Sequence, residues 1–294
     1  MPAPFTRALC GYRPDRDNPN KITDKPNMSD AGDSLSVELG TALLDRLKIP
    51  KGKCAPADPG TDLERQIINH LKQLRPDLRI ERGRSAREFS QYAHLDVFAG
   101  FQRTFGDLRP TVSRLGERVR GADLGRARAG IERDLRKLAE NVDQQAALVT
   151  DLAEQMPEES LLRIDVSVAI PQESGPDELA IALSSKWSLR TDRAQDCVSQ
   201  GNKLVAQRRG RMPHFGVITI EPRPAMLRIL ADGSGAVDFV YHLDLPALIA
   251  SIDEVAQRRP SNWSPAQIFA RLMGQHRLRD FDKLVHEVSR VPEP

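Results

Sequence analysis

An aspartate inside one apolar segment and a lysine just past the next are the residues best suited to chemistry in this chain. Asp165 lies in Leu162–Ile170, and Lys186 follows the apolar run Leu179–Leu183. The intervening residues 171–177 are typical of a turn, which predicts a β-hairpin that brings the two side chains together. A carboxylate and an amine at adjacent strand ends are the minimum for metal-assisted phosphodiester hydrolysis. On spacing alone, two solvated strand residues are the competing interpretation.

Three polar residues follow the lysine at what the sequence indicates is the start of a helix. Arg190 and Arg193 can each pair with guanine O6 and N7, and Asp192 can accept from cytosine N4. At a helix N-terminus, the three could enter the major groove and read adjacent G·C pairs. Asp192 is also the predicted N-cap, because its carboxylate can accept free N–H groups of the first turn. The competing interpretation is a capped helix flanked by surface arginines.

The composition is that of a soluble globular protein with no overall basic surplus. Of 294 residues, 39% are apolar and 29% charged, and the formal net charge is +2. Positive charge is concentrated locally at 79–87 and 208–211. The three cysteines have no metal-ligand spacing, and no apolar run approaches the ~20 residues that span a bilayer. We therefore expect a cytoplasmic protein with no membrane partner.

Changes in hydrophobic period predict an α/β fold with a mixed central sheet flanked by helices. We expect one domain over 1–294, with an N-terminal arm at 1–34 and a helical insertion at about 107–156. A disordered tail is the alternative for the arm. The other expected elements are helices at about 35–48, 61–74, 89–106, 192–207, 245–257, 264–273 and 280–289, and strands at about 78–82, 214–220, 227–230 and 236–241.

Several motifs in the second half of the chain resemble a known enzyme family. They read SSKWSLRTDRAQ, SQGNKLV, RRGRMPHFGVITIEPRP and VDFVYHL, with shorter matches PGTDLE and QYAHL upstream. Together they resemble the NgoMIV-like restriction endonucleases, a tetrameric type IIF group of the PD-(D/E)xK nuclease superfamily. The resemblance is dense over about 178–245, patchy over 28–100 and absent over roughly 101–157. It implies a restriction-endonuclease-like core with Mg²⁺ as cofactor and double-stranded DNA as partner.

The resemblance assigns catalytic roles to four residues. The family's metal-binding aspartate matches Asp165, although Ile164 stands where the family has proline. The family's Ser-x-Lys matches Ser184 and Lys186. An additional acid from an upstream helix matches Glu64, which the resemblance makes a second metal ligand.

The same resemblance assigns DNA contacts. The readers of the inner bases of a CCGG core match Arg190, Asp192 and Arg193, the triplet already suited to G·C pairs. The family's outer-base arginine aligns with Met226, although Arg223 and Arg228 lie close by in the sequence. An acidic residue of the early loop, Asp30 or Asp33, is a further candidate for an outer-base contact.

One catalytic position departs from the family pattern. The family has a glutamate fourteen positions after the lysine, and here that position is Gln200. A neutral amide does not supply a carboxylate's charge to a metal. Three explanations stay open: the chain is an inactivated variant prepared for study, the metal site relies on Glu64 and Asp165, or Asp196 one helical turn earlier substitutes.

Three hypotheses follow. The favoured one is a Mg²⁺-dependent type II restriction endonuclease that cuts double-stranded DNA at a palindrome with a CCGG core and, by resemblance, acts as a homotetramer of two dimers. The second is a DNA-binding protein on a nuclease fold that has lost catalysis, which Gln200 favours. The third is an α/β protein that shares only the hairpin and shows no salt-dependent affinity for DNA.

Overall fold

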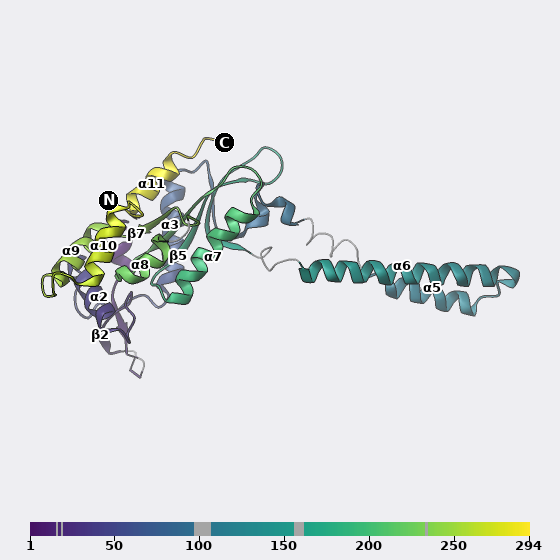
Figure 1. Cartoon of the computed structure of the whole chain (residues 1–294), viewed down its shortest axis with the longest axis horizontal. Helices are drawn as coiled ribbons and strands as arrows, with labels where there is room; N and C mark the ends of the chain where they lie inside the picture. The colour runs from purple at the N-terminus through teal and green to yellow at the C-terminus, as the bar shows by residue number, and fades with distance from the viewer. Residues whose placement is uncertain (16, 19, 97–106, 156–161, 233–234) are drawn as a thin grey trace. The chain divides into compact units, whose positions relative to one another are not determined.

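The computed structural model describes residues 1–294 apart from 16, 19, 97–106, 156–161 and 233–234 (Figure 1). The chain divides into two compact units. The first, here called the core unit, joins Met1–Gln91 to Leu162–Pro294, and the second, the hairpin unit, is Tyr92–Leu161. No helix within the described ranges is long and apolar enough to cross a bilayer.

A six-stranded mixed sheet organises the core unit. Its strands follow the order β3-β4-β5-β6-β7-β8. The first three are antiparallel, and the strands from β5 onward run parallel. The expected mixed central sheet is therefore confirmed. The strands are β3 (Arg79–Ser85), β4 (Arg163–Ile170), β5 (Glu178–Lys186), β6 (His214–Thr219), β7 (Phe239–His242) and β8 (Leu278–Asp280).

The sequence dictates the middle of this sheet. Strand β6 was expected from a nearly continuous apolar run, and its residues Phe215–Thr219 are all buried. Such runs are typical of strands that are covered on both faces. The turn between β4 and β5 closes the predicted hairpin, in which Val166 pairs with Leu183. That antiparallel register brings the start of β4 level with the end of β5.

Helices cover the sheet of the core unit. Helix α3 begins at Pro59 after the cap Asp58 and packs against β3, β4 and β5. Glycine at position 201 lets helix α7 approach the segment before β7 closely, since a Cβ there would lie 2.5 Å from the Ala236 carbonyl oxygen. The helices of this unit are α1 (Thr6–Leu9), α2 (Ser34–Arg46), α3 (Pro59–Leu74), α7 (Thr191–Gln207), α8 (Pro224–Ala231), α9 (Leu245–Ala256), α10 (Ser264–Gly274) and α11 (Phe281–Ser289), with a 3₁₀ turn η1 (Ala86–Glu88).

The N-terminal residues, expected as an arm or loop, are folded onto the core unit. They form α1 and a two-stranded sheet of β1 (Tyr12–Pro14) and β2 (Ile22–Pro26). Phe5 and Leu9 are buried, and the Ala3 amide donates to the Leu243 carbonyl at 2.8 Å. Burial of this apolar surface makes the alternative of a disordered tail wrong.

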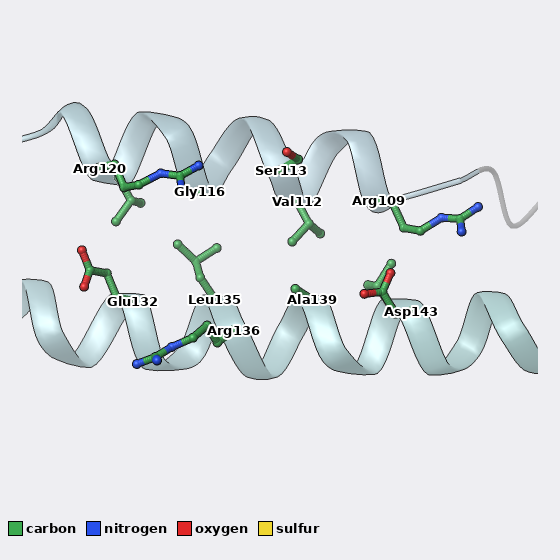
Figure 2. A pocket seen from close by; sticks show the side chains of 12 residues that line it. Arg109, Val112, Ser113, Gly116, Arg120, Glu132, Leu135, Arg136, Ala139 and Asp143 are labelled. Atoms are coloured by element: carbon green, nitrogen blue, oxygen red, sulfur yellow. The ribbon is translucent and has the colours of Figure 1, made fainter.

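The hairpin unit contains the helices expected at 107–156. Helix α5 (Arg109–Gly121) and helix α6 (Arg128–Gln155) are joined through the 3₁₀ turn η3 (Gly125–Ala127). A cavity of about 620 Å³ lies between them. Figure 2 shows Val112 and Leu135 pointing into the space between the two helices. A further 3₁₀ turn is η2 (Ala93–Leu95).

Two elements differ from the expectation, and a third falls largely outside the described residues. The strand expected at Leu227–Leu230 is wrong, because this segment belongs to α8, which has Pro224 in its first turn and buries Leu227 and Leu230 at helical spacing. Strand β8 was not expected, since three residues carry no periodic signal. The helix expected at 89–106 falls largely on 97–106, which lies outside the described residues.

Candidate active site at the ends of two paired strands

Asp165 is held by three donors from the neighbouring strand. One oxygen, Oδ2, accepts from the Ser184 hydroxyl at 3.1 Å, the Ser185 backbone amide at 2.9 Å and the Lys186 ammonium at 2.9 Å. The antiparallel register of β4 and β5 makes these contacts possible, because it brings Asp165 level with the last residues of β5. The side-by-side placement expected of Asp165 and Lys186 is therefore confirmed.

The Asp165–Lys186 pair is only partly removed from solvent. The two side chains keep 21% and 20% of their surface exposed. Burial works against the charge on Lys186, but Asp165 outweighs it and holds the pKa of Lys186 above its ordinary value. The lysine is therefore a fixed positive charge at neutral pH, which suits a phosphate ligand rather than proton abstraction.

Glu64 reaches the same region from α3. Burial raises the pKa of Glu64, the ion pair with Arg82 lowers it, and the nearby charge of Asp165 raises it again, so that the net shift is upward. The side chain is 14% exposed. The structure thus brings Glu64 electrostatically close to Asp165, as the expected second acid of the site.

Glu64 and Lys186 line one cavity of about 650 Å³. Two of the residues that line it, Ser185 and Trp187, each carry a fully buried polar side-chain atom that has no hydrogen-bond partner among the described residues. The wall also includes Thr61, Glu64, Lys186, Asp192, Arg193 and Asp196.

The expected base-reading triplet lies at the start of α7. Arg190, Asp192 and Arg193 are all exposed, and the last two line the cavity. The prediction that Asp192 caps the helix is wrong, because Arg190 occupies the N-cap position without a side-chain cap and Asp192 lies within the first turn. The carboxylate of Asp192 is thus not used as the helix cap.

A second ion pair, which was not expected, follows β6. Glu221 is fully buried and accepts from the Arg223 side-chain Nε at 2.6 Å and the Leu189 amide at 2.7 Å. Arg223 donates back to the Leu189 carbonyl at 2.6 Å, so the pair holds both backbone groups of the residue before Arg190. Burial and Glu221 act in opposite directions on Arg223, and its pKa is raised on balance. The only sequence signal for this pair is an acid directly after an apolar strand.

The remaining candidates for DNA contacts lie either around Arg223 or on α8. Asp30 and Asp33 lie 3.8 Å and 3.5 Å from the Arg223 guanidinium, and Asp33 also caps α2. Arg223 itself, a candidate base contact, has a side chain only 11% exposed. On α8, Met226 is half-buried and Arg228 is exposed.

Gln200 lies outside the set of residues that line the cavity. Its side-chain Nε2 donates to the Asp196 carboxylate at 3.1 Å, one turn earlier on α7. Asp196 does line the cavity. The structure therefore brings together the expected residues Glu64, Asp165, Ser184 and Lys186. Gln200 contacts Asp196 instead and does not line the cavity.

The residues fit a hydrated hard cation rather than a fully caged one. Within the described ranges there is no group of three or more His, Cys, Asp or Glu side chains arranged to hold a metal. Mg²⁺ keeps several waters and is commonly bound by one or two carboxylates together with substrate phosphates. Two such carboxylates are present: Glu64 lines the cavity, and Asp165 accepts a hydrogen bond from Lys186, which lines it too.

Comparison with known proteins identifies the family of this chain. A family model described as NgoMIV restriction enzyme matches residues 26–289. The chain is also 37% identical over 107 residues to the type II restriction enzyme NgoMIV of Neisseria gonorrhoeae, a match that covers 36% of this chain and 35% of that protein. The match thus spans about a third of the length of the curated relative. The family model covers most of the chain, and the chain belongs to the NgoMIV restriction enzyme family.

Proposed function

We propose that this chain is a Mg²⁺-dependent type II restriction endonuclease that cuts double-stranded DNA at a palindromic site with a CCGG core. The observation that carries the proposal is the bond between Asp165 and Lys186, together with the cavity that Lys186 lines with Asp192 and Arg193. Acid, lysine and base-reading side chains thus lie on one short stretch of chain. Because restriction acts on DNA inside the cell, we propose a location in the bacterial cytoplasm.

The proposed reaction is in-line hydrolysis of a phosphodiester. A water oxygen bonds to phosphorus, the bond from phosphorus to the 3′ oxygen breaks, that oxygen takes up a proton, and the phosphate stays on the 5′ end. When bound at Asp165 and Glu64, Mg²⁺ would polarise the phosphate and lower the pKa of a bound water. Lys186 stabilises the negative charge that develops on the phosphate oxygens. Ser184 and the Ser185 amide hold Asp165 in place for this task.

Recognition is proposed for the exposed triplet at the start of α7. Arg190 and Arg193 pair with guanines, and Asp192 accepts from cytosine N4. Only three residues separate Lys186 from Arg190, so the reading and cutting groups move as one piece. Arg228 and Met226 on α8, with Asp30 and Asp33, are proposed to lie at the outer base pairs. Arg223 is proposed to position this region rather than to read bases.

Assembly is proposed from membership of the family. The two-fold symmetry of a palindromic site matches a dimer whose two chains are related by a two-fold axis. We propose a homotetramer made of two such dimers, each of which holds one DNA site. Sedimentation of the chain with and without a short CCGG duplex tests this, because a tetramer predicts two duplexes per four chains.

Digestion of plasmid DNA with Mg²⁺, followed by sequencing of the ends, tests the proposed activity. We expect discrete fragments with 5′-phosphates, all cut within CCGG, and no cleavage when Mg²⁺ is chelated. Random nicking would contradict the proposal. Failure of both the wild type and a Gln200→Glu variant to cut would contradict it as well.

A second candidate function is sequence-specific DNA binding without catalysis. The observation that favours it is the neutral side chain of Gln200 at the position of the family's glutamate. It predicts tight binding to CCGG duplexes with no strand cleavage in Mg²⁺. The plasmid digest separates the two functions directly.

A further inference from the structure

The hairpin unit carries a large share of the exposed apolar side chains of this protein. Of the seven large apolar side chains that are exposed in the described part of the chain, four belong to this unit: Leu108, Leu115, Leu138 and Leu148. Their exposed fractions are 53%, 43%, 45% and 61%. Single exposed leucines are ordinary, but several on one small unit indicate an interaction surface.

The apolar residues of both helices repeat at the spacing of a helical bundle. Steps of four and three residues are typical of helices that pack along their whole length. All the described residues of α5 nevertheless stay at least partly exposed. The two helices therefore do not complete a core by themselves. The repeating residues are Leu108, Val112, Leu115 and Val119 in and just before α5, and Ile131, Leu135, Leu138 and Val142 in α6.

Helix α6 extends well past its neighbour. Figure 2 shows Arg109 opposite Asp143 and Arg120 opposite Glu132, so the two helices are antiparallel. Helix α5 has 13 residues and α6 has 28, which correspond to about 20 Å and about 42 Å. Because α5 begins at Arg109, it covers α6 only as far as Asp143. The rest of α6, 144–155, is here called its extended end.

Two of the exposed leucines lie on one face of the hairpin unit. Gly116 of α5 and Ala139 of α6 line the cavity between the helices. Leu115 and Leu138 come directly before them, which is about 100° earlier around each helix. In two antiparallel helices, the same step turns both side chains toward the same side of the pair. Leu115 and Leu138 thus share one face, here called the leucine face.

Charge is distributed unevenly along the hairpin unit. In α6, residues 128–137 carry four basic and two acidic side chains, whereas 138–151 carry three acidic and no basic ones. Helix α5, beside the first part of α6, adds four arginines and one glutamate. Two antiparallel copies of α6 would place the negative part of each beside the positive part of the other, whereas parallel copies would place like charges together.

We infer that the leucine face binds the leucine face of a second copy of this chain, with the two α6 helices antiparallel and the two-fold axis near the middle of α6. The four helices then form an antiparallel bundle. Leu115 and Leu138 become buried in it, and each extended end lies against the other hairpin. The surface is self-complementary, as a two-fold interface requires. The inference does not depend on the proposed nuclease function.

The first test measures the mass of the full chain without DNA by sedimentation over a range of concentrations. Leu115→Glu/Leu138→Glu places charges on the leucine face, at exposed positions and with a residue that favours helices. Leu74→Glu is the matched control at an exposed leucine of α3. Circular dichroism verifies that all three proteins keep their helices.

We expect the double variant to raise the dissociation constant of the pair by more than about 100-fold, because two buried leucines are lost from each side of the interface. Leu74→Glu should associate as the wild type does. If copies also associate through the core unit, as in the proposed tetramer, the mass of the double variant falls to half that of the wild type.

Short cross-links test the antiparallel direction. A single cysteine replaces either Asn141 or Asp134, which lie three residues after and four residues before Leu138, in a chain whose exposed Cys54 is changed to serine. We expect Asn141→Cys, near the axis, to link two copies rapidly. Asp134→Cys should link them poorly, because it lies about 20 Å along the helix from its counterpart. Equal linking at both positions would contradict the antiparallel arrangement.

The inference is overturned if the wild type is monomeric at every concentration, or if the double variant associates as the wild type does. Unchanged association with weaker DNA affinity would assign the leucine face to DNA. Unchanged association with a lower melting temperature would assign it to another part of the same chain. Cleavage of a CCGG duplex is measured on the same proteins. If none of them cuts while only the double variant fails to pair, the proposed nuclease function is wrong and this inference stands.

Discussion

Two ion pairs at the ends of neighbouring strands differ in what surrounds them. The Asp165–Lys186 pair at the end of β5 leaves about a fifth of each side chain exposed beside a cavity. The Glu221–Arg223 pair just after β6 is closed, with Glu221 at 0% and Arg223 at 11% exposure. The Asp165–Lys186 pair stays accessible to solvent and to a ligand. The Glu221–Arg223 pair instead forms hydrogen bonds with the Leu189 backbone. The open pair is therefore suited to chemistry and the closed pair to support.

The two pairs are connected through Leu189. Leu189 lies between Lys186, the proposed catalytic lysine, and the proposed base-reading triplet, and the closed pair holds its amide and its carbonyl. These two hydrogen bonds connect the residues just after β6 to Leu189, which directly precedes the start of α7. We therefore expect the closed pair to fix the distance between Lys186 and the proposed base-reading residues at the start of α7.

Breaking the closed pair is expected to give the largest effect. Arg223→Met leaves Glu221 buried without its cation, which typically costs about 3–5 kcal/mol of unfolding free energy. Urea denaturation of the variant measures the loss. A double variant, Glu221→Leu/Arg223→Met, removes both charges and should recover part of it. Equal stability of the wild type and Arg223→Met would show that the pair does not support the fold.

Removing the lysine of the open pair is expected to affect rate rather than stability. Lys186→Ala should slow single-turnover cleavage by about 10²–10³-fold, the usual effect of losing one group that stabilises transition-state charge. Lys283→Ala, at an exposed position of α11, is the matched control and should cut normally. A Lys186→Ala protein that unfolds readily in urea but cuts at the normal rate would reverse the roles assigned to the two pairs.

The pH dependence should distinguish Glu64 from an ordinary surface acid. Burial raises its pKa above the usual 4.5, and cation binding needs the ionised form, so cleavage should fall as the pH drops through that raised value. For stability the sign is opposite, since an acid with a raised folded-state pKa loses its stabilising contribution as the pH rises through it. Glu64→Gln should therefore raise the melting temperature at neutral pH while it lowers the cleavage rate. A lower melting temperature would contradict this account.

The smallest effect is expected at the edge of the recognition surface. Arg228 is exposed on α8, and exposed charges contribute within about 1 kcal/mol. Arg228→Ala should change cleavage by only a few-fold and alter the preference for bases that flank CCGG, while the core stays required. Sequencing the ends from a library of flanking sequences measures this. Loss of the CCGG requirement would move core recognition from α7 to α8.

Sequence alone predicted the open pair because its signals are local. Two apolar runs and a turn fix the β4–β5 hairpin, and the period of two sets which residues meet across it. The closed pair was missed because Glu221 and Arg223 acquire their roles only by contact with Leu189, more than thirty positions away. The α8 helix was mistaken for a strand because Leu227–Leu230, a stretch of four residues with three apolar ones, is too short to separate the two periods. The Asp192 cap was misassigned because helix boundaries depend on packing as well as on cap residues.

The most direct test of the central claim follows one CCGG duplex with two proteins, the wild type and Asp165→Asn. Binding is measured without metal, and cleavage of both strands is measured after Mg²⁺ is added. The account predicts that both proteins bind CCGG in preference to a duplex with an altered core, and that only the wild type then cuts both strands, leaving 5′-phosphates. Undiminished cutting by Asp165→Asn would contradict the assignment of the open Asp165–Lys186 pair as the catalytic centre.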